Sequence, residues 1–160
     1  RLSLPRGVDL AVCALDSLDY ITAPRDCAEA IRRVYRALNP GGMFIFDVNT
    51  IYKHREILAN NTFVYDCNDV YCVWQNSLRD DDRVDISLDI FELEDEVYYR
   101  STEEFSERAY PIDDYKKWLS DADFEVLHIY DEMSDHELND KTQRAVFVAR
   151  YKGYKKPEER

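Results

Sequence analysis

Glycine is scarce in this sequence. Only four glycines occur among the 160 residues, and Gly7, Gly41, Gly42 and Gly153 do not form a GxGxxG loop. Nicotinamide-dependent oxidoreductases of the Rossmann type hold the cofactor pyrophosphate on such a loop, at the start of a helix. The missing loop therefore argues against that class of enzyme.

Basic residues are also few. The chain has 21 Lys and Arg against 33 Asp and Glu, which gives a formal net charge of -12. This charge repels polyphosphates, so DNA, RNA and anionic membrane surfaces are disfavoured as partners. A small anionic ligand in a local pocket remains compatible with the composition.

Long apolar runs and paired cysteine motifs are missing as well. No run approaches the ~20 apolar residues of a membrane span, and no signal peptide is visible. The four cysteines (Cys13, Cys27, Cys67 and Cys72) show no CxxC spacing. A structural zinc site needs four ligands, so we predict no metal site. Reduced thiols in a cytoplasmic protein fit best.

The 45% hydrophobic content argues for a folded domain, and residues 8–49 show its organisation. Val8–Leu15 and Met43–Phe46 are apolar runs, and between them lies a helical pattern from about Pro24 to Leu38. The turn Asn39–Gly42 ends this helix. A strand–helix–strand unit of this kind forms a parallel pair, with the helix across one face of the sheet.

Polar residues follow both predicted strands. Asp16, Asp19 and Tyr20 come after the first strand, and Asp47 and Asn49 come after the second. In open α/β sheets, ligands bind at the carboxyl ends of the strands. We therefore expect the functional site at these two strand ends.

Residues 51–110 have a different character, with many tyrosines and no glycine. Tyr71–Leu78, Val84–Ile90 and Val97–Arg108 read as strands, and the middle one alternates apolar and polar residues. This pattern predicts an antiparallel meander with one packed and one wet face.

The chain then returns to a mixed pattern. Pro111 opens a short helix with Tyr115 and Leu119 on its inner face, and Phe124–Tyr130 and Ala145–Tyr151 are the last strands. We interpret 1–50 and 111–151 as one core, 51–110 as an inserted β cap or lid, and 152–160 as a tail.

These elements, in this order, resemble the carboxyl-terminal part of a class I S-adenosylmethionine-dependent methyltransferase. The resemblance is carried by Val8–Tyr20, Leu38–Thr50, Glu107–Pro111 and Ala122–Val126. It is greatest to the bacterial small-molecule subgroup with a β insertion after the fifth strand. It implies an α/β fold, a partial Rossmann-like methyltransferase sheet with strand order 4-5-7-6, and an inserted antiparallel β meander. Asp123 stands where that family usually has Gly, and Asp tolerates the same backbone.

The resemblance implies S-adenosylmethionine as the cofactor. Ala14, Leu15 and Asp16 would line its methionine side, and Tyr20 offers an aromatic face to the sulfonium. Two alternatives stay open: Asp16 caps a loop turn, or Leu15 belongs to the core.

The acceptor is expected beside the second strand. The candidate acceptor-binding residues are Asn49, Tyr52, Arg108 and Tyr110, and the candidate catalytic residues are Asp47 and His54. Asp47 suits a general base or a hydrogen-bond anchor. The alternatives are a turn-forming role for Asp47, a surface ion pair for Arg108 and a structural role for His54.

The family's glycine-rich loop has no counterpart in this sequence. The sequence therefore predicts an amino-terminally truncated methyltransferase for a small-molecule acceptor, which by itself binds cofactor weakly or not at all. The alternative is a non-catalytic protein-interaction module or a degenerate fragment. A homodimer is compatible with either reading.

Overall fold

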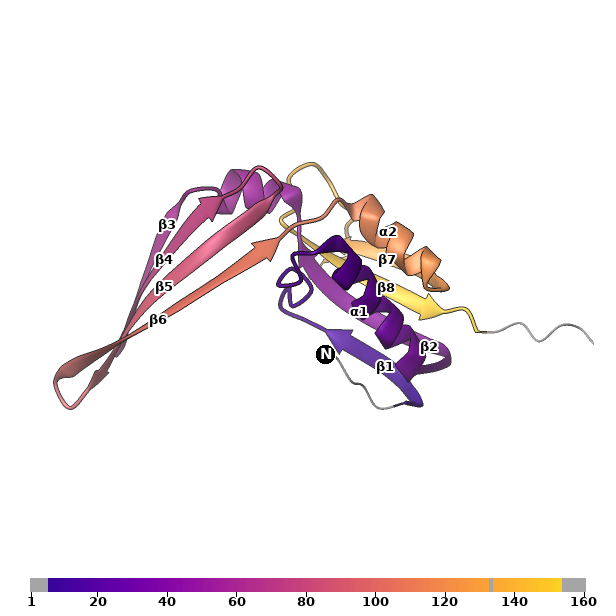
Figure 1. The fold of residues 1–160 in the computed structure, drawn as a ribbon, viewed down its shortest axis with the longest axis horizontal. Helices are drawn as coiled ribbons and strands as arrows, with labels where there is room; N and C mark the ends of the chain where they lie inside the picture. The colour runs from indigo at the N-terminus through magenta and orange to yellow at the C-terminus, as the bar shows by residue number, and fades with distance from the viewer. Residues whose placement is uncertain (1–5, 133, 154–160) are drawn as a thin grey trace, which may run out of the picture.

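The computed structural model describes residues 6–132 and 134–153, which form two four-stranded sheets (Figure 1). One sheet has the strand order β1-β2-β8-β7 and carries both α-helices on one face. The other has the order β3-β4-β5-β6 and extends away from it as an arm. Most of the predicted tail, 154–160, lies outside the described residues.

The parallel pair predicted at the start of the chain is confirmed. Strand β1 (Val8–Cys13) runs parallel to β2 (Leu38–Asn49), and Cys13 lies opposite Phe46. Strand β1 ends two residues earlier than expected, because Leu15 and Asp16 adopt left-handed backbone angles, with φ of 58° and 49°.

The predicted turn at Asn39–Gly42 lies inside β2 as an irregularity. Val8 is opposite Leu38 and Leu10 is opposite Met43, so the intervening residues of β2 bulge out of register. Gly41 has a φ of 83°. A Cβ on Gly42 would lie 2.9 Å from the Asn39 carbonyl oxygen, so the backbone passes too closely for a side chain there.

Helix α1 (Pro24–Ala37) covers one face of the sheet with a stripe of apolar residues at spacings of three and four. Cys27, Ala30, Ile31 and Val34 are buried against the core. Pro24 occupies the first turn, where its missing N–H is not needed. The spacing of three and four residues therefore identified the packed face correctly.

The remaining core elements also match the prediction. Helix α2 (Ile112–Asp121) buries Tyr115 and Leu119, and Asp123 after it has the expected left-handed φ of 64°. Strands β7 (Phe124–Asp131) and β8 (Arg144–Tyr151) are antiparallel, and β8 is antiparallel to β2. The order β1-β2-β8-β7 agrees with the partial sheet expected from the resemblance.

The second sheet is the predicted meander with one strand more. Strands β4 (Val70–Leu78), β5 (Arg83–Glu94) and β6 (Val97–Arg108) were expected, whereas β3 (Thr62–Cys67) was not. A π-helical segment η1 (Lys53–Leu58) precedes them. Leu58 of η1 packs with Val84 and Ile86 of β5 in a small separate core. Neither α-helix in the described residues is long and apolar enough to be a membrane span.

Candidate functional site

The carboxyl ends of β1 and β2 meet polar side chains from four other segments. We call this group of side chains the site cluster. It comprises residues from the turn after β1, the end of β2, η1, the end of β6 and the start of β8. Its members are Asp16, Asp19, Asp47, Asn49, Lys53, Glu107 and Arg144. The two predicted strand ends thus share one edge.

Arg144 joins the two strand ends. Its guanidinium contacts Asp47 Oδ2 through one nitrogen and Asp16 Oδ2, at 2.9 Å, through the other. The backbone N–H of Asp16 donates to Asp47 Oδ2 at 3.0 Å. Arg144 reaches this position because it begins β8, directly opposite Asn49 of β2.

Asn49 is the centre of a second set of contacts. Its side-chain nitrogen donates to Asp16 Oδ2 at 2.7 Å and to Glu107 Oε2 at 3.3 Å. Its side-chain oxygen accepts a hydrogen bond from Lys53 Nζ at 2.8 Å. One amide therefore connects β1, β6 and η1.

Asp19 lies beneath this surface with no exposed area. It accepts hydrogen bonds from the Asn49 backbone N–H at 2.7 Å and from the Tyr115 hydroxyl at 3.2 Å. Burial raises the pKa of Asp19 well above its usual range, and the Asn49 N–H opposes this shift. Asp19 thus connects the end of β2 to Tyr115 in the core.

Glu107 and Lys53 also have shifted pKa values. Burial, aided by the nearby Asp16 carboxylate, raises the pKa of Glu107 from 4.5 to about 7. Burial and then the Arg144 charge lower the pKa of Lys53. The cluster therefore holds four carboxyl groups and two cations, and two of the carboxyl groups, Asp19 and Glu107, bind their protons more tightly than usual.

The predicted cofactor-side residues surround this edge. Leu15 is 77% exposed, so it is not a core residue, whereas Leu18 is buried. The Ala14 carbonyl accepts a hydrogen bond from Ser17 Oγ at 2.6 Å. Tyr20 is half exposed and stacks on Phe105 of β6, with ring centroids 5.1 Å apart.

The predicted acceptor-side residues occupy different surroundings. The Tyr110 ring is buried, its hydroxyl donates to the Ile21 carbonyl at 2.6 Å, and the Arg108 guanidinium lies 5.1 Å from the ring centroid. Arg108 also donates to the Thr22 carbonyl at 3.1 Å. Tyr52 and Tyr110 line a pocket of about 210 Å³ beside the start of α2.

His54 is fully buried in η1. Its Nδ1 lies 2.8 Å from the Asp82 carbonyl oxygen, and Nε2 has no hydrogen-bond partner within residues 6–132 and 134–153. Burial lowers the pKa of the imidazole. In this structure the ring has no exposed surface to offer to an acceptor, so its assignment as a base stays a prediction.

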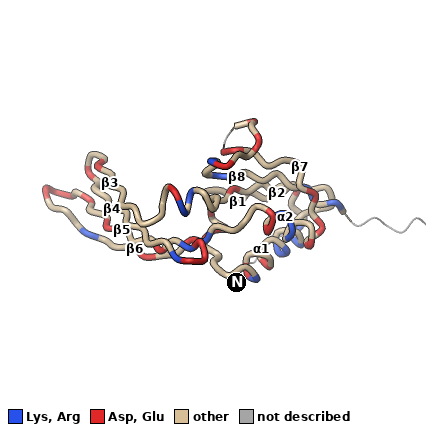
Figure 2. The backbone as a smooth tube through the Cα atoms, turned by 90° about the horizontal axis from the view of Figure 1, so that it is seen from above, with Lys and Arg blue, Asp and Glu red and all other residues tan. Residues whose placement is uncertain are grey.

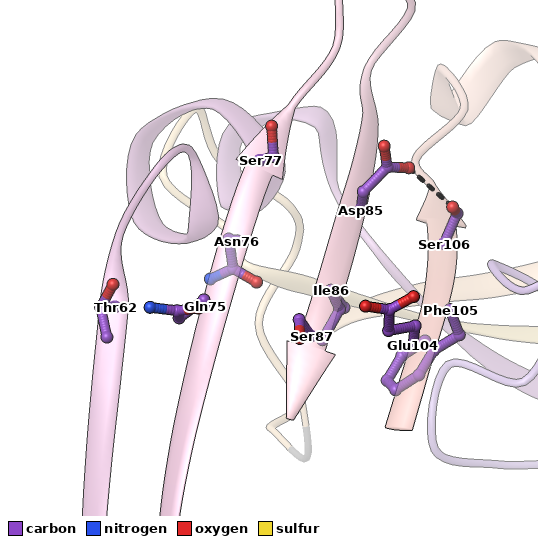
Figure 3. A pocket seen from close by; sticks show the side chains of 10 residues that line it. All are labelled: Thr62, Gln75, Asn76, Ser77, Asp85, Ile86, Ser87, Glu104, Phe105 and Ser106. Carbon is purple, nitrogen blue, oxygen red and sulfur yellow. Dashed lines mark hydrogen bonds between the residues drawn. The ribbon is translucent and has the colours of Figure 1, made fainter. Parts of the chain in front are cut away.

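A larger hollow lies elsewhere, on the arm. It has a volume of about 640 Å³ and is lined by residues of all four strands of the second sheet (Figure 3). Gln75, Ser87 and Glu104 are cross-strand neighbours on its face, and Ser106 Oγ donates to Asp85 there at 2.6 Å. Because side chains alternate along a strand, this face is opposite to that of Glu107. The hollow is thus separate from the site cluster.

The sequence pattern missed three members of the cluster: Lys53, Glu107 and Arg144. Glu107 lies in a stretch that carries the resemblance, and Arg144 directly precedes the last predicted strand, Ala145–Tyr151. A signal for Arg144 was therefore present, because a final strand antiparallel to β2 begins at the carboxyl end of β2.

Comparisons with known proteins were made for the whole chain. No protein-family model matches it. The chain is 28% identical over 142 residues to "Putative methyltransferase YqeM" of Bacillus subtilis, which covers 88% of this chain and 58% of that protein. It therefore spans somewhat more than half the length of this relative.

Solved structures show the same fold. An S-adenosylmethionine-dependent methyltransferase from Clostridium acetobutylicum superimposes with a TM-score of 0.89 and 35% identity, over 96% of this chain and 62% of that one. The amino pentose methyltransferase CalS10 from Micromonospora echinaspora, solved with S-adenosylmethionine bound, gives a TM-score of 0.70 at 12% identity. It covers 94% of this chain and 61% of that one, and at this identity it supports the fold alone.

Proposed function

We propose that this chain, which by sequence and fold is related to class I S-adenosylmethionine-dependent methyltransferases, takes part in methyl transfer to a small-molecule acceptor. The observation that carries the proposal is the site cluster. It lies where two parallel strands end side by side, which is where ligands bind in open α/β sheets.

The cluster fits a positively charged cofactor. When bound, S-adenosylmethionine supplies a methyl group on a sulfonium, which is already activated for displacement. Asp16 and Asp47 are both paired with Arg144, and Glu107, whose pKa is about 7, loses its proton more readily when a cation binds beside it. Carboxylates held in place by hydrogen bonds attract such a charge without having to reorganise. We therefore assign the donor to this edge of the sheet.

On the cofactor side, we propose that Ala14, Leu15 and Asp16 face the methionine part. The exposed Leu15 side chain and the left-handed turn support this placement. Tyr20, held against Phe105, would present its ring to the sulfonium.

On the acceptor side, Asn49 is the proposed contact at the end of β2, with Tyr52 and Tyr110 lining the neighbouring pocket and Arg108 beside it. The partners of Asp47 favour the anchor role over the base role, since Arg144 and the Asp16 N–H occupy one carboxylate oxygen. We keep His54 as the second candidate base. Residues 51–110 would then act as a cap that limits the entry of water.

The acceptor class follows from the size and charge of the site. No basic surface is needed for a small neutral or cationic acceptor, and the chain carries a formal net charge of -12. Proteins of the same fold include CalS10, described as an amino pentose methyltransferase. An amine or hydroxyl of a small molecule is therefore the proposed nucleophile, and a cytoplasmic location is part of the proposal.

The test is calorimetry with S-adenosylmethionine, together with release of S-adenosylhomocysteine in the presence of matched small amines and alcohols. The 160-residue chain is compared with the protein read from any coding sequence that continues upstream of it, which we call the full-length protein. We expect binding and turnover by the full-length protein, and weaker or no binding by the chain alone. A full-length protein that binds no cofactor would contradict the proposal.

An interaction module is the second candidate, and one observation favours it. Tyr71 and Tyr98 are exposed on one face of the far end of the arm, and Tyr65 and Tyr99 are exposed on the other face. Exposed aromatic rings of this kind are typical of interaction surfaces, and we take the Tyr71 and Tyr98 face as the candidate surface. A second copy of the chain is the partner that we propose for this surface. Absence of cofactor binding together with a stable dimer would favour this candidate.

A further inference from the structure

We propose that Arg144 is a positioning residue that holds the Leu15–Asp16 turn in the backbone conformation required for cofactor binding. The identity of the ligand rests on the proposed function, whereas the geometry of the turn does not. Arg144 comes from β8, 128 residues after Asp16, so the sequence around the turn does not reveal its role.

The turn is a conformation that these residues seldom adopt alone. Leu15 and Asp16 follow one another with φ of 58° and 49°, and neither is glycine. Left-handed backbone is unfavourable for residues with a Cβ, particularly for a branched apolar side chain. Leu15 is 77% exposed, so little burial compensates. Such a conformation persists only where surrounding groups hold it.

The holding contacts converge on Asp16. Its backbone N–H donates to Asp47 Oδ2 at 3.0 Å, and its carboxylate accepts from Asn49 at 2.7 Å and from Arg144 at 2.9 Å. Arg144 also contacts the same Asp47 oxygen. The guanidinium therefore fixes the side chain of Asp16 directly and its backbone through Asp47.

The charge of Arg144 is needed as well as its shape. Asp16 and Asp47 both bond to it, and Glu107 adds a third nearby carboxylate. The other cation of the cluster, Lys53, donates to Asn49. Without Arg144, the two carboxylates would repel each other, and the turn would open toward ordinary backbone angles.

The strand β8 offers a matched control. Arg150 lies on the same strand and pairs with Glu125 at 2.7 Å, but this ion pair is exposed and lies opposite Met43, at the other end of the β2–β8 pairing from Arg144. Arg150→Met therefore removes an arginine–carboxylate pair without affecting the turn. Arg144→Lys keeps a charge, but an ammonium cannot grip two carboxylates in the fixed geometry of a guanidinium.

The experiment measures amide hydrogen exchange and S-adenosylmethionine affinity in the full-length protein with Arg144→Met, Arg144→Lys and Arg150→Met. For Arg144→Met we expect exchange of the Asp16 amide to accelerate about tenfold or more, relative to the Phe46 amide in β2. If the competent turn becomes a minor conformation, the dissociation constant rises by about the same factor. Arg144→Lys should lie between wild type and Arg144→Met, and Arg150→Met should match wild type.

The outcomes separate the two proposals. Equal Asp16 exchange in Arg144→Met and Arg150→Met would overturn the positioning role. Faster exchange with unchanged cofactor affinity would also overturn it, because the turn would then not serve the cofactor. If the wild-type protein binds no S-adenosylmethionine, the proposed function fails, and the role of Arg144 in cofactor binding fails with it. The exchange data still report whether Arg144 fixes the turn.

Discussion

Glu107 is the carboxyl group of the site with the clearest pH signature. Its folded pKa is raised from 4.5 to about 7, so the folded chain binds this proton more tightly than the unfolded chain does. Between about pH 4.5 and 7, this group therefore makes the free energy of unfolding fall as pH rises. Above that window its contribution no longer changes.

Glu107→Gln should remove this dependence while keeping the shape and the contact with Asn49. We compare the free energy of unfolding of the variant with that of wild type at pH 5 and at pH 8. We expect this difference to shift in favour of the variant by about 1 to 2 kcal/mol from pH 5 to pH 8, after allowance for solvent screening. Urea unfolding at both pH values measures the difference. Glu104→Gln, on the opposite and exposed face of β6, is the control. A constant difference across this pH range would contradict the raised pKa.

At the same scale, the sequence predicted those site residues that directly follow a strand. Asp16, Asp47 and Asn49 were expected together, and the hydrogen bonds between them confirm that they meet. Lys53 and Arg144 were not predicted, because their positions depend on the path of η1 and on the start of β8. Periodicity locates a residue on its own element, but contacts between distant elements are fixed by how those elements pack.

At the scale of elements, long periodic segments were predicted well and short ones were not. Helix α1 and strand β6 have nearly the expected bounds. Strand β3 and the π-helical η1 were missed, since six residues give too few repeats for a period to be recognised.

The irregularity in β2 gives a prediction for this strand. Gly42→Ala would place a Cβ 2.9 Å from the Asn39 carbonyl oxygen and 3.2 Å from that of Asp9, so the strand must shift. We expect a loss of about 1 to 3 kcal/mol in the free energy of unfolding, as for other overpacked sites. Urea denaturation measures it.

Gly41→Asn is the control for that substitution. A Cβ added at Gly41 would meet nothing within 4 Å, and Asn tolerates the left-handed φ of 83°. A loss of stability equal to or greater than that of Gly42→Ala would show that backbone angle, and not the close approach, limits this part of β2.

At the scale of the whole molecule, charge sets the choice of partners. Acidic residues occur along both sheets and their connections (Figure 2), and the formal net charge is -12. We expect the dissociation constant for a short DNA duplex to exceed about 10⁻⁴ M even at low salt, which is weaker than usual non-specific binding. Fluorescence anisotropy measures this, with a basic DNA-binding protein as the positive control. Salt-sensitive micromolar binding would contradict the expectation.

The edge of the first sheet governs self-association of the 160-residue chain. Within the described residues, β1 pairs only with β2, and Leu10 and Val12 are 54% and 62% exposed on the face away from the helices. An open, apolar edge strand is a template for pairing with another chain, and a lysine on it opposes such pairing. Val12→Lys should therefore reduce the self-association that sedimentation velocity detects over a concentration series.

Ser120→Lys is the matched control for that experiment, because it adds the same charge on the exposed side of α2, away from the edge. If both variants reduce association equally, net charge is responsible and the edge is not. If neither does, the contact lies elsewhere, and the exposed Tyr71 and Tyr98, which share one face of the arm, become the surface to alter next. A wild-type chain that stays monomeric at high concentration would contradict the expectation that the open edge of β1 drives self-association.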